Sequence, residues 1–340
     1  MYLSELSALR GVSGNEAAVR TYISEQIRGL VDEMWVDPMG NLFARKGTHL
    51  SGPHVMLAAH MDEVGLLVTH IEDDGLLRFD TVGGIDHRVL PSVWVQVGDE
   101  AVPGVIGAKA IHLKKPEERG KPVARDDLFI DIGARSKAEA EKLVQPGDYA
   151  TFWTDYEELG DRRAKGKAFD DRVGCHVLME LLKDEVQTPL TAVFTVQEEI
   201  GLRGAQVAAY TVQPDVALVL EGTTCADIPL SIPHGESTKL GHGPAITVAD
   251  RSTVVQPRMV ELLIEAGERA GVPYQLKRTT FGGTDAGTIH RAGAGVRTGI
   301  VSVPCRYIHT PAAMLSLDDV ENTVRLVRAF LDSIPAGGSL

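Results

Sequence analysis

Hydrophobic residues along the chain alternate between short apolar runs and amphipathic stretches. The apolar runs predict buried strands at residues 53–59, 191–197, 216–220 and 296–303. Apolar residues that recur on one helical face predict helices at 172–183, 204–210, 256–270 and from residue 316 onwards. Because strands and helices alternate in this way, we expect an α/β fold around a mainly parallel or mixed sheet.

The segment from about residue 64 to residue 156 has a different pattern. Its many short β-like runs are separated by Gly, Asp and Pro turns, and only 136–143 has a clear helical pattern. Closely spaced strands with turn residues between them are typical of a small barrel or sandwich. We therefore predict a discontinuous α/β domain formed by residues 1–65 and 161–340, interrupted by an inserted β domain at residues 66–160.

Three predicted helices begin with a serine that is followed three residues later by an acid. The pairs are Ser13 and Glu16, Ser136 and Glu139, and Ser316 and Asp319. In a capping box of this kind, the two side chains accept hydrogen bonds from free backbone N–H groups of the first turn. We expect these pairs to set the N-termini of the three helices.

Titratable residues gather where the apolar strands end. Glu198 and Glu199 end the run VFTVQEE, and two adjacent buried carboxylates are costly without a positive partner. His60 and Asp62 follow another apolar strand. Alternate residues of an extended chain point to the same side, so Asp62 is expected to reach the ring N–H of His60. Ligands of open α/β sheets bind at the carboxyl ends of strands, which is where these residues are expected.

Further candidates occupy similar positions. Asp170 and Asp171 precede a predicted helix, Glu221 ends the run VALVLE, and His309 follows the last strand. Each also has a purely structural interpretation: a helix cap, an ion pair with the adjacent Arg172, a turn carboxylate, or a structural histidine. Together they form a nitrogen and oxygen donor set that suits Zn²⁺, Co²⁺ or Mn²⁺ and is typical of two-metal hydrolytic sites.

Composition excludes several classes of function. The formal net charge of -13, without a basic run, disfavours nucleic-acid binding. No apolar stretch of about 18 residues predicts a membrane span, and the N-terminus does not have the pattern of a signal peptide. The three widely spaced cysteines predict no disulfide framework, so we expect a cytoplasmic protein.

Six motifs resemble those of the M42 family of metallo-aminopeptidases, in the correct order and over essentially the whole chain. They are HMDEVG (60–65), KAFDDRVGC (167–175), QEEIGLRGA (197–205), LEGTTCADIP (220–229), FGGTDAGTIH (281–290) and VPCRYIHT (303–310). The resemblance implies an α/β catalytic domain interrupted by a small PDZ-like β-barrel that mediates dimerisation. It also implies that dimers assemble into a tetrahedral dodecamer.

The resemblance implies roles for individual residues as well. It implies two divalent metal ions per subunit, with Zn²⁺ expected and Co²⁺ or Mn²⁺ as alternatives. The implied ligands are His60, Asp170 and Glu221 for one ion, and Asp170, Glu199 and His309 for the other. Glu198 would be the general base, and Asp62 would orient a metal-binding histidine. Glu221 stands where the family commonly has Asp, and its longer side chain bears on metal preference rather than on activity.

The predicted function is therefore a metal-dependent aminopeptidase that acts on peptides through a metal-activated bridging water, with Glu198 as the base. One alternative is a glycosidase with paired carboxylates, which would not need the two histidines. A second is a non-catalytic peptide-binding scaffold. The preferred N-terminal residue stays open, because Arg251, Lys277 and Arg278 are either contacts for acidic substrates or ordinary surface charges.

Overall fold

The apolar runs form the middle of a mixed sheet in the computed structural model, which describes residues 2–229, 237–277 and 279–334. Four neighbouring strands are parallel, in the order β12 (Leu190–Thr195), β3 (Val55–His60), β13 (Val216–Thr224) and β16 (Arg297–Arg306). Every residue of β12 and β3 is buried. Parallel strands covered on both faces have continuous apolar runs rather than alternating ones, which explains the sequence pattern.

Antiparallel strands extend this sheet on both sides. On the β12 side lie β2 (Leu42–Lys46) and then β1 (Glu33–Val36). On the β16 side lie β17 (Ala313–Ser316), β11 (Arg163–Gly166) and β10 (Glu157–Leu159). β14 (Ala245–Thr247) pairs antiparallel with β16 and parallel with β15 (Gln275–Lys277). The predicted mixed α/β sheet is thus confirmed.

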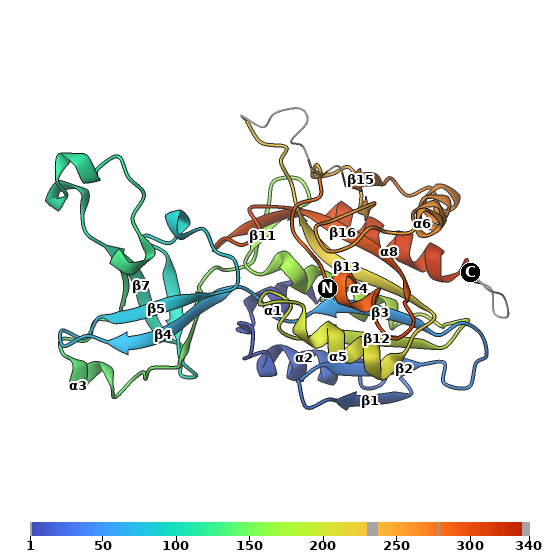
Figure 1. Cartoon of the computed structure of the whole chain (residues 1–340), viewed down its shortest axis with the longest axis horizontal. Helices are drawn as coiled ribbons and strands as arrows, with labels where there is room; N and C mark the ends of the chain where they lie inside the picture. Colours follow the sequence, from blue (N-terminus) through green and yellow to red (C-terminus); the bar gives the residue numbers. More distant parts are fainter. Residues whose placement is uncertain (1, 230–236, 278, 335–340) are drawn as a thin grey trace.

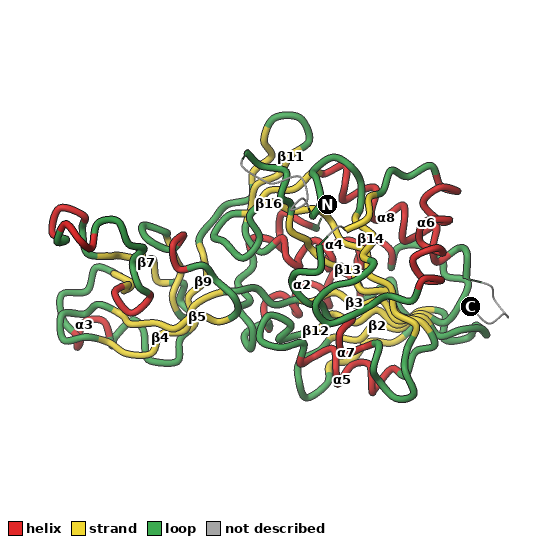
Figure 2. Tube along the Cα trace, turned by 45° about the horizontal axis from the view of Figure 1, so that its top comes forward, coloured by secondary structure: helices red, strands yellow, loops and turns green. Residues whose placement is uncertain are grey.

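Helices cover both faces of the sheet. On one face, α4 (Phe169–Leu181) and α8 (Leu317–Leu331) contact the central strands and each other, with α6 (Pro257–Ala270) against α8 and α1 (Leu3–Ala8) against α4. On the other side of the sheet, α5 (Arg203–Val212) and α7 (Ala286–Ile289) pack together (Figure 2). The remaining helix of this part is α2 (Ala17–Ile27). None of the described helices is both long and apolar enough to cross a membrane.

The inserted segment forms a separate β-barrel that projects from the larger part (Figure 1). Its strands are β4 (Gly65–Ile71), β5 (Leu77–Val82), β6 (Trp94–Val97), β7 (Val102–Ala108), β8 (Leu128–Asp131) and β9 (Tyr149–Phe152). They close in the order β4-β5-β8-β7-β6-β9 around their own apolar core, and α3 (Lys137–Ala140) lies between β8 and β9 in the chain. The inserted β-barrel is confirmed, while the domain limits at residues 66 and 160 stay a prediction.

The predicted capping boxes are wrong. Ser13 lies ahead of α2, and its hydroxyl donates to the carboxylate of Asp62 (2.5 Å). Ser136 and Ser316 occupy the N-cap positions of α3 and α8, but neither side chain bonds a helix N–H. The carboxylate of Asp319 accepts instead from two backbone N–H groups of the loop before β14. Tertiary contacts thus use the side chains of Ser13 and Asp319, while the hydroxyl of Ser316 has no hydrogen-bond partner among the described residues.

Candidate metal centre and active site

The carboxyl ends of the parallel strands bring the predicted site residues to one edge of the sheet. His60 is the last residue of β3 and lies opposite Thr195, the last residue of β12. Glu198 and Glu199 lie in the loop that follows β12. Glu221 lies within β13, because this strand continues to Thr224 instead of ending at residue 220 as predicted. The common edge follows from the parallel arrangement, since such strands all end on the same side of the sheet.

Asp170 lies between the two histidines. Its Oδ1 is 3.3 Å from Nε2 of His60, and its Oδ2 is 3.5 Å from Nε2 of His309. Asp170 and Asp171 have non-helical backbone angles at the start of α4, and the peptide bond between them is cis. A Cβ on Gly222 of β13 would lie 3.0 Å from the Cα of Asp170, so this glycine permits the close approach of the two chains.

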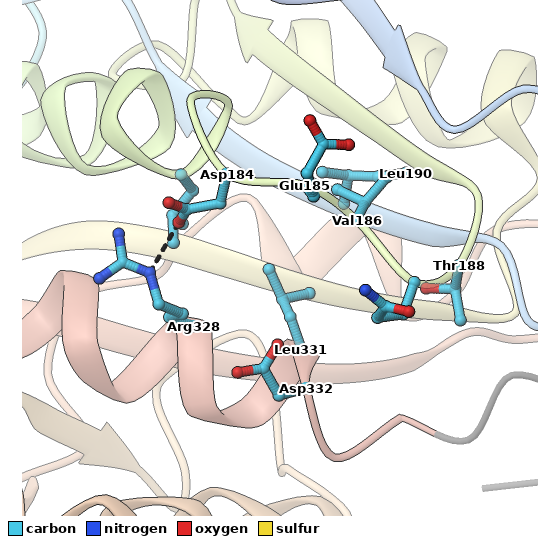
Figure 3. Close-up of a pocket in the computed structure, with 10 residues that line it drawn as sticks. Asp184, Glu185, Val186, Thr188, Leu190, Arg328, Leu331 and Asp332 are labelled. Carbon is cyan, nitrogen blue, oxygen red and sulfur yellow. Dashed lines mark hydrogen bonds and ion pairs between the residues drawn. The ribbon is translucent and has the colours of Figure 1, made fainter.

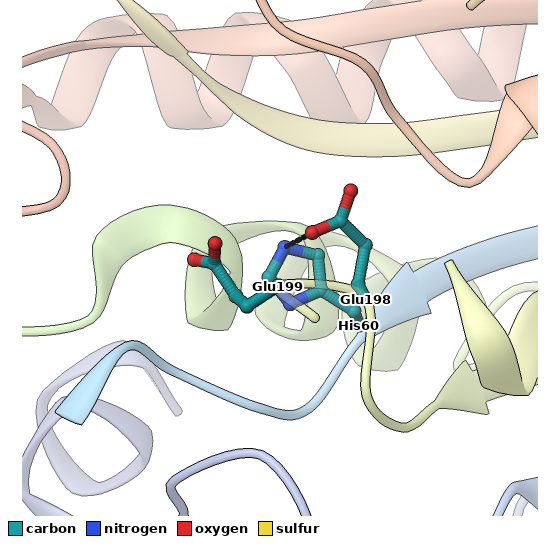
Figure 4. A group of neighbouring side chains, drawn as sticks. All are labelled: His60, Glu198 and Glu199. Carbon is teal, nitrogen blue, oxygen red and sulfur yellow. Dashed lines mark ion pairs between the residues drawn. The ribbon is translucent and has the colours of Figure 1, made fainter. Parts of the chain in front are cut away.

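The glutamates lie around the same histidines. Oε2 of Glu221 is 3.6 Å from Nε2 of His60, and Oε2 of Glu199 is 3.3 Å from Nε2 of His309. Oε2 of Glu198 lies farther away, 3.9 Å from Nε2 of His60. Figure 4 shows that the carboxylate of Glu198 faces His60 while that of Glu199 points to a different side. The two adjacent acids therefore occupy different positions in the site.

His309 is fixed by a contact with the inserted segment. The chain turns sharply after β16, with left-handed backbone at His309 (φ 58°). The Nδ1 atom of this ring lies 2.8 Å from the carbonyl oxygen of Gly84, in the loop after β5. Because the Nδ1–H donates to that carbonyl, the other ring nitrogen, Nε2, is the one that faces Asp170 and Glu199. This contact could not be predicted from local sequence patterns, because more than two hundred residues separate its partners.

Asp62 has more partners than the sequence analysis predicted. Its Oδ1 lies 3.4 Å from Nδ1 of His60, but the same ring nitrogen is closer to the backbone carbonyl of Asp62, at 3.1 Å. The Asp62 carboxylate also accepts from the backbone N–H groups of Glu198 (3.0 Å) and Glu199 (3.2 Å). One buried carboxylate thus links the end of β3 to the loop that carries both glutamates.

Two buried carboxylate oxygens in the site have no hydrogen-bond donor among the described residues. They are Oδ1 of Asp170 and Oε1 of Glu221. A buried acceptor without a partner is destabilising, and a divalent cation that takes nitrogen and oxygen ligands would satisfy both atoms. Asp171 also lies near His60 and Glu221, but its two oxygens accept from backbone N–H groups of His60 and Gly174. Asp170 is therefore the aspartate that is free to bind an ion.

Burial and crowded negative charge alter the acidities in the site. Desolvation raises the pKa of Glu198 and Glu221 well above the usual range, and raises that of Glu199 to about 7. Burial alone would lower the pKa of His309, but its contacts with Asp170 and Glu199 raise it to about 9. These acids and histidines hold protons that a divalent cation would displace. The residues present thus fit a metal site.

Two groups of buried charges near the site were not predicted. Arg172 does not pair with the aspartates beside it in sequence; its Nη2 contacts Glu63 (3.1 Å), which also binds Lys167 (2.7 Å). Asp285 is fully buried, with Oδ2 accepting from the hydroxyl of Thr195 (2.5 Å) and Oδ1 without a hydrogen-bond partner among the described residues. Asp285 lies in the motif FGGTDAG, which the sequence analysis noted, but nothing in that motif indicated a role for this aspartate.

A cavity of about 690 Å³ opens over the site. Its lining includes the carboxylates of Asp170, Glu198, Glu199 and Glu221 together with His309, and also Arg251, Lys277 and Phe281. Arg278, the third cation considered in the sequence analysis, lies outside the described residues.

A smaller cavity of about 170 Å³ lies between the ends of α4 and α8, beside the Arg328–Asp184 ion pair (Figure 3). Its lining contains no histidine or cysteine, and the Asp184 carboxylate is already paired with Arg328.

Comparison with known proteins agrees with this architecture. The family profile described as M42 glutamyl aminopeptidase matches residues 40–326. The lysyl aminopeptidase of Pyrococcus furiosus is 32% identical over 95% of this chain and 94% of its own length. The TET aminopeptidase structure from a marine sediment Thaumarchaeota archaeon is 39% identical with a TM-score of 0.94, and covers 98% of this chain and 95% of its own.

A third similar protein is the TET1 peptidase of Pyrococcus horikoshii, whose structure is described as assembling into a tetrahedron or a large octahedral shell. It is 36% identical with a TM-score of 0.86, and covers 96% of this chain and 97% of its own. The family profile covers most of the chain, and these relatives match it nearly from end to end. The chain therefore belongs to the M42 family of aminopeptidases.

Proposed function

We propose that the protein is a metal-dependent aminopeptidase that uses two divalent ions to remove N-terminal residues from peptides. The observation that carries this proposal is the position of Asp170, whose two oxygens each face Nε2 of a different histidine, at 3.3 Å and 3.5 Å. One carboxylate between two histidines is suited to bridging a pair of ions.

The proposed ligands divide into two sets. One ion is held by His60, Asp170 and Glu221, and the other by Asp170, Glu199 and His309. Support comes from the short distances within each set and from the unpartnered oxygens of Asp170 and Glu221. When bound, divalent ions in such a site lower the pKa of a water and polarise a carbonyl group. Zn²⁺ is the expected ion, with Co²⁺ and Mn²⁺ as alternatives.

Glu198 is the proposed general base. Desolvation raises its pKa well above the usual range, which favours acceptance of a proton. Its backbone N–H donates to Asp62, so its position is tied to the strand that carries His60. Its carboxylate takes a proton from the attacking water and passes it to the leaving amine. The free α-amino group of the substrate lies against the carboxylates of Glu199 and Glu221, which accounts for cleavage at the N-terminus.

The test combines elemental analysis with turnover of a panel of aminoacyl p-nitroanilides, before and after chelation. We expect about two divalent ions per chain, and loss of turnover on chelation that the ion reverses. Glu198→Gln should retain the metal and lose most activity, by about 10²-fold or more. Glu141→Gln, an exposed change on the barrel, is the matched control and should keep full activity. Normal hydrolysis by Glu198→Gln would refute the assignment of the base.

The same assays separate the two alternatives. A glycosidase would hydrolyse a glucan substrate in the presence of a chelator, because it does not depend on the histidines. A peptide-binding scaffold would contain no metal and would leave every anilide intact. Membership of an aminopeptidase family favours the peptidase over both alternatives.

We also propose that the protein assembles into a homo-oligomer built from dimers, with the dodecamer as the expected form. The related TET1 peptidase provides the precedent. Trp94 and Trp153 of the barrel are 57% and 43% exposed and pack edge to face, 6.2 Å apart. An exposed aromatic pair of this kind suits burial against another subunit. Native mass spectrometry tests the proposal, and a monomer at micromolar concentration would refute it.

A further inference from the structure

A second buried carboxylate holds the loop of the proposed base, in addition to that of Asp62. It belongs to Glu16, which is only 4% exposed and stands immediately before α2. Its Oε1 accepts from the backbone N–H of Gln197, at 3.2 Å. Because Gln197 directly precedes Glu198, this bond connects the N-terminal segment of the chain to the residue proposed as the base.

The backbone N–H groups of four successive residues, 196–199, all donate to side chains from other parts of the chain. The acceptors are Asn41 for Val196 (3.1 Å), Glu16 for Gln197 (3.2 Å), and Asp62 for both Glu198 (3.0 Å) and Glu199 (3.2 Å). A backbone N–H in a folded interior needs an acceptor, and here three side chains outside the loop supply it. These side chains therefore determine the conformation of the loop.

The backbone of Gln197 has a conformation that needs such support. Its φ of 57° lies in the left-handed region, which a residue other than glycine adopts at a free-energy cost. Its carbonyl oxygen accepts from the N–H of Arg203 (3.2 Å), so the N–H and the carbonyl of Gln197 are both bound. Relaxation to an ordinary negative φ would rotate the chain just before Glu198 and redirect its side chain.

The two adjacent glutamates differ in how far they depend on this backbone. The carboxylate of Glu199 lies 3.3 Å from Nε2 of His309, and in the proposed site it also binds an ion. The carboxylate of Glu198 faces His60, whose Nε2 is 3.9 Å away (Figure 4). With no closer ion pair among the described residues, the position of the Glu198 carboxylate is set mainly by the backbone that carries it.

Glu16 is itself held in place. Its backbone carbonyl accepts from the N–H of Arg20 (3.0 Å) in the first turn of α2, and its Oε1 also accepts from the N–H of Gly14 (2.7 Å). The N–H of Ser13 donates to the carbonyl of Glu63 (3.3 Å), in the turn that follows β3. The carboxylate of Glu16 therefore starts from a fixed position, as a group that supports a catalytic side chain must.

We infer that Glu16 is a positioning residue for the general base. Glu16 does not line the cavity over the site; it holds Gln197 in the left-handed conformation that directs the side chain of Glu198 toward that cavity. The inference rests on the proposed function, because it takes Glu198 as the base. Misplacing a catalytic group by about 1 Å can cost roughly 10²-fold in rate, so loss of this bond should lower kcat while the ions stay bound.

The test separates the length of the Glu16 side chain from its charge. Glu16→Gln keeps the length and one acceptor oxygen, whereas Glu16→Asp keeps the charge and is shorter by one methylene. In the metal-loaded proteins, kcat for aminoacyl p-nitroanilides should fall at least about tenfold in Glu16→Asp and stay within about threefold of the wild type in Glu16→Gln. KM and metal content should hardly change, because Glu16 touches neither substrate nor ion. The reverse order of the two variants, or equal kcat in all three proteins, would overturn the inference.

Asp319→Asn is the matched structural control. Like Glu16, Asp319 is a buried acid (1% exposed), and its carboxylate accepts from two backbone N–H groups, those of Gly241 and Gly243. Neither glycine lines the cavity over the site. This variant should lose stability in urea unfolding and keep the wild-type kcat. If Glu16→Asp behaves in the same way, its role is purely structural and the inference is wrong.

Amide hydrogen exchange, followed by mass spectrometry on peptides that contain residues 196–202, gives a second measurement. Exchange should be faster than in the wild type for Glu16→Asp, and unchanged for Glu16→Gln and Asp319→Asn. If Glu16→Asp does not fold, Glu16→Gln decides. Slow exchange together with normal kcat, or the loss of both, supports the inference, and a change in only one of them contradicts it.

The exchange measurement also separates this inference from the proposed function. If the wild type hydrolyses no anilide, the aminopeptidase proposal fails, and exchange alone then tests the contact. Faster exchange of residues 196–202 in Glu16→Asp supports Glu16 as the residue that holds this loop. Equal exchange in the wild type and Glu16→Asp overturns it.

Discussion

Glu63 is the centre of a buried charge network behind the active site, and its removal should strongly destabilise the protein. Its carboxylate binds Lys167 (2.7 Å), Arg172 (3.1 Å) and the backbone N–H of Gly11 (3.0 Å). The side chains of Glu63, Lys167 and Arg172 are all almost completely buried. The substitution to test is Glu63→Gln, which keeps the shape of the side chain and removes only its charge.

The expected magnitude follows from the two cations that the substitution leaves without a counter-charge. Removing one partner of a buried ion pair typically costs about 3–5 kcal/mol, because the remaining charge stays desolvated. Glutamine leaves no cavity, so loss of packing does not contribute. For a domain of this size, a change of about 3–5 kcal/mol lowers the midpoint of thermal unfolding by roughly 6–20 °C.

The pH dependence has a definite sign. Burial lowers the pKa of Lys167 to about 8, although the negative charge of Glu63 opposes this shift. A lysine whose folded pKa lies below its unfolded value makes stability rise with pH between the two values. Without Glu63, the pKa of Lys167 falls further and this rise begins at lower pH. The difference in stability between wild type and variant should therefore be smaller at pH 9 than at pH 6.

The assay is thermal unfolding followed by tryptophan fluorescence and circular dichroism, at pH 6 and pH 9. Glu261→Gln is the control, because Glu261 forms an exposed ion pair with Arg258 (3.3 Å) and such pairs contribute about 1 kcal/mol or less. If Glu63→Gln melts within about 2 °C of the wild type at pH 6, the network does not stabilise the fold as argued.

Three further predictions concern packing, a buried acid and metal retention. Gly204→Ala should destabilise the protein by about 1–3 kcal/mol in urea unfolding, because the new Cβ would lie 2.4 Å from the carbonyl oxygen of Val196. Thr195→Val should cost about 1–3 kcal/mol in the same assay, because it removes the hydroxyl that donates to the buried carboxylate of Asp285. Metal retained after dialysis should fall as pH decreases from 8 to 5.5, because protons compete for His309, whose pKa in the metal-free site is raised to about 9.

Controls for these predictions come from the same chain. Gly29→Ala should be nearly neutral, because a Cβ there meets no atom within 4 Å. Thr195→Ser keeps the hydroxyl and should retain most of the stability that Thr195→Val loses. Equal stability of Gly204→Ala and Gly29→Ala would contradict the packing argument. Metal content that does not change with pH would contradict the competition between protons and the ion.

The main features of the fold and of the candidate site could be predicted from local patterns. Apolar runs without alternation indicated buried parallel strands, and β3 and β12 are buried throughout. Charged residues directly after such runs had to lie at one sheet edge, as His60 and Glu198 do. The change of pattern near residue 64 indicated the inserted barrel. Each inference depends on residues close together in sequence, because the spacing of apolar residues along a short segment indicates whether it forms a strand or a helix.

Contacts between distant segments could not be predicted in this way. Ser13 and Asp319 matched a helix-capping pattern, but each is used in a tertiary contact. Nothing near Gly84 in the sequence indicates that its carbonyl fixes the ring of His309. Likewise, Lys277 ends the short strand β15 and has no distinguishing neighbour in sequence, and its place in the cavity depends on how β15 joins the sheet.

The sequence by itself thus determined the α/β class, the inserted barrel and the kinds of side chain at the strand ends, because strand burial and sheet polarity follow from short-range periodicity. Tertiary structure alone decided which aspartate has free oxygens, how Asp62 holds both glutamates, and which cations line the cavity over the site. These features depend on distances between residues more than a hundred positions apart. Such distances depend on the order of the strands in the sheet and on the conformation of the loops that connect them, and neither follows from short-range sequence patterns.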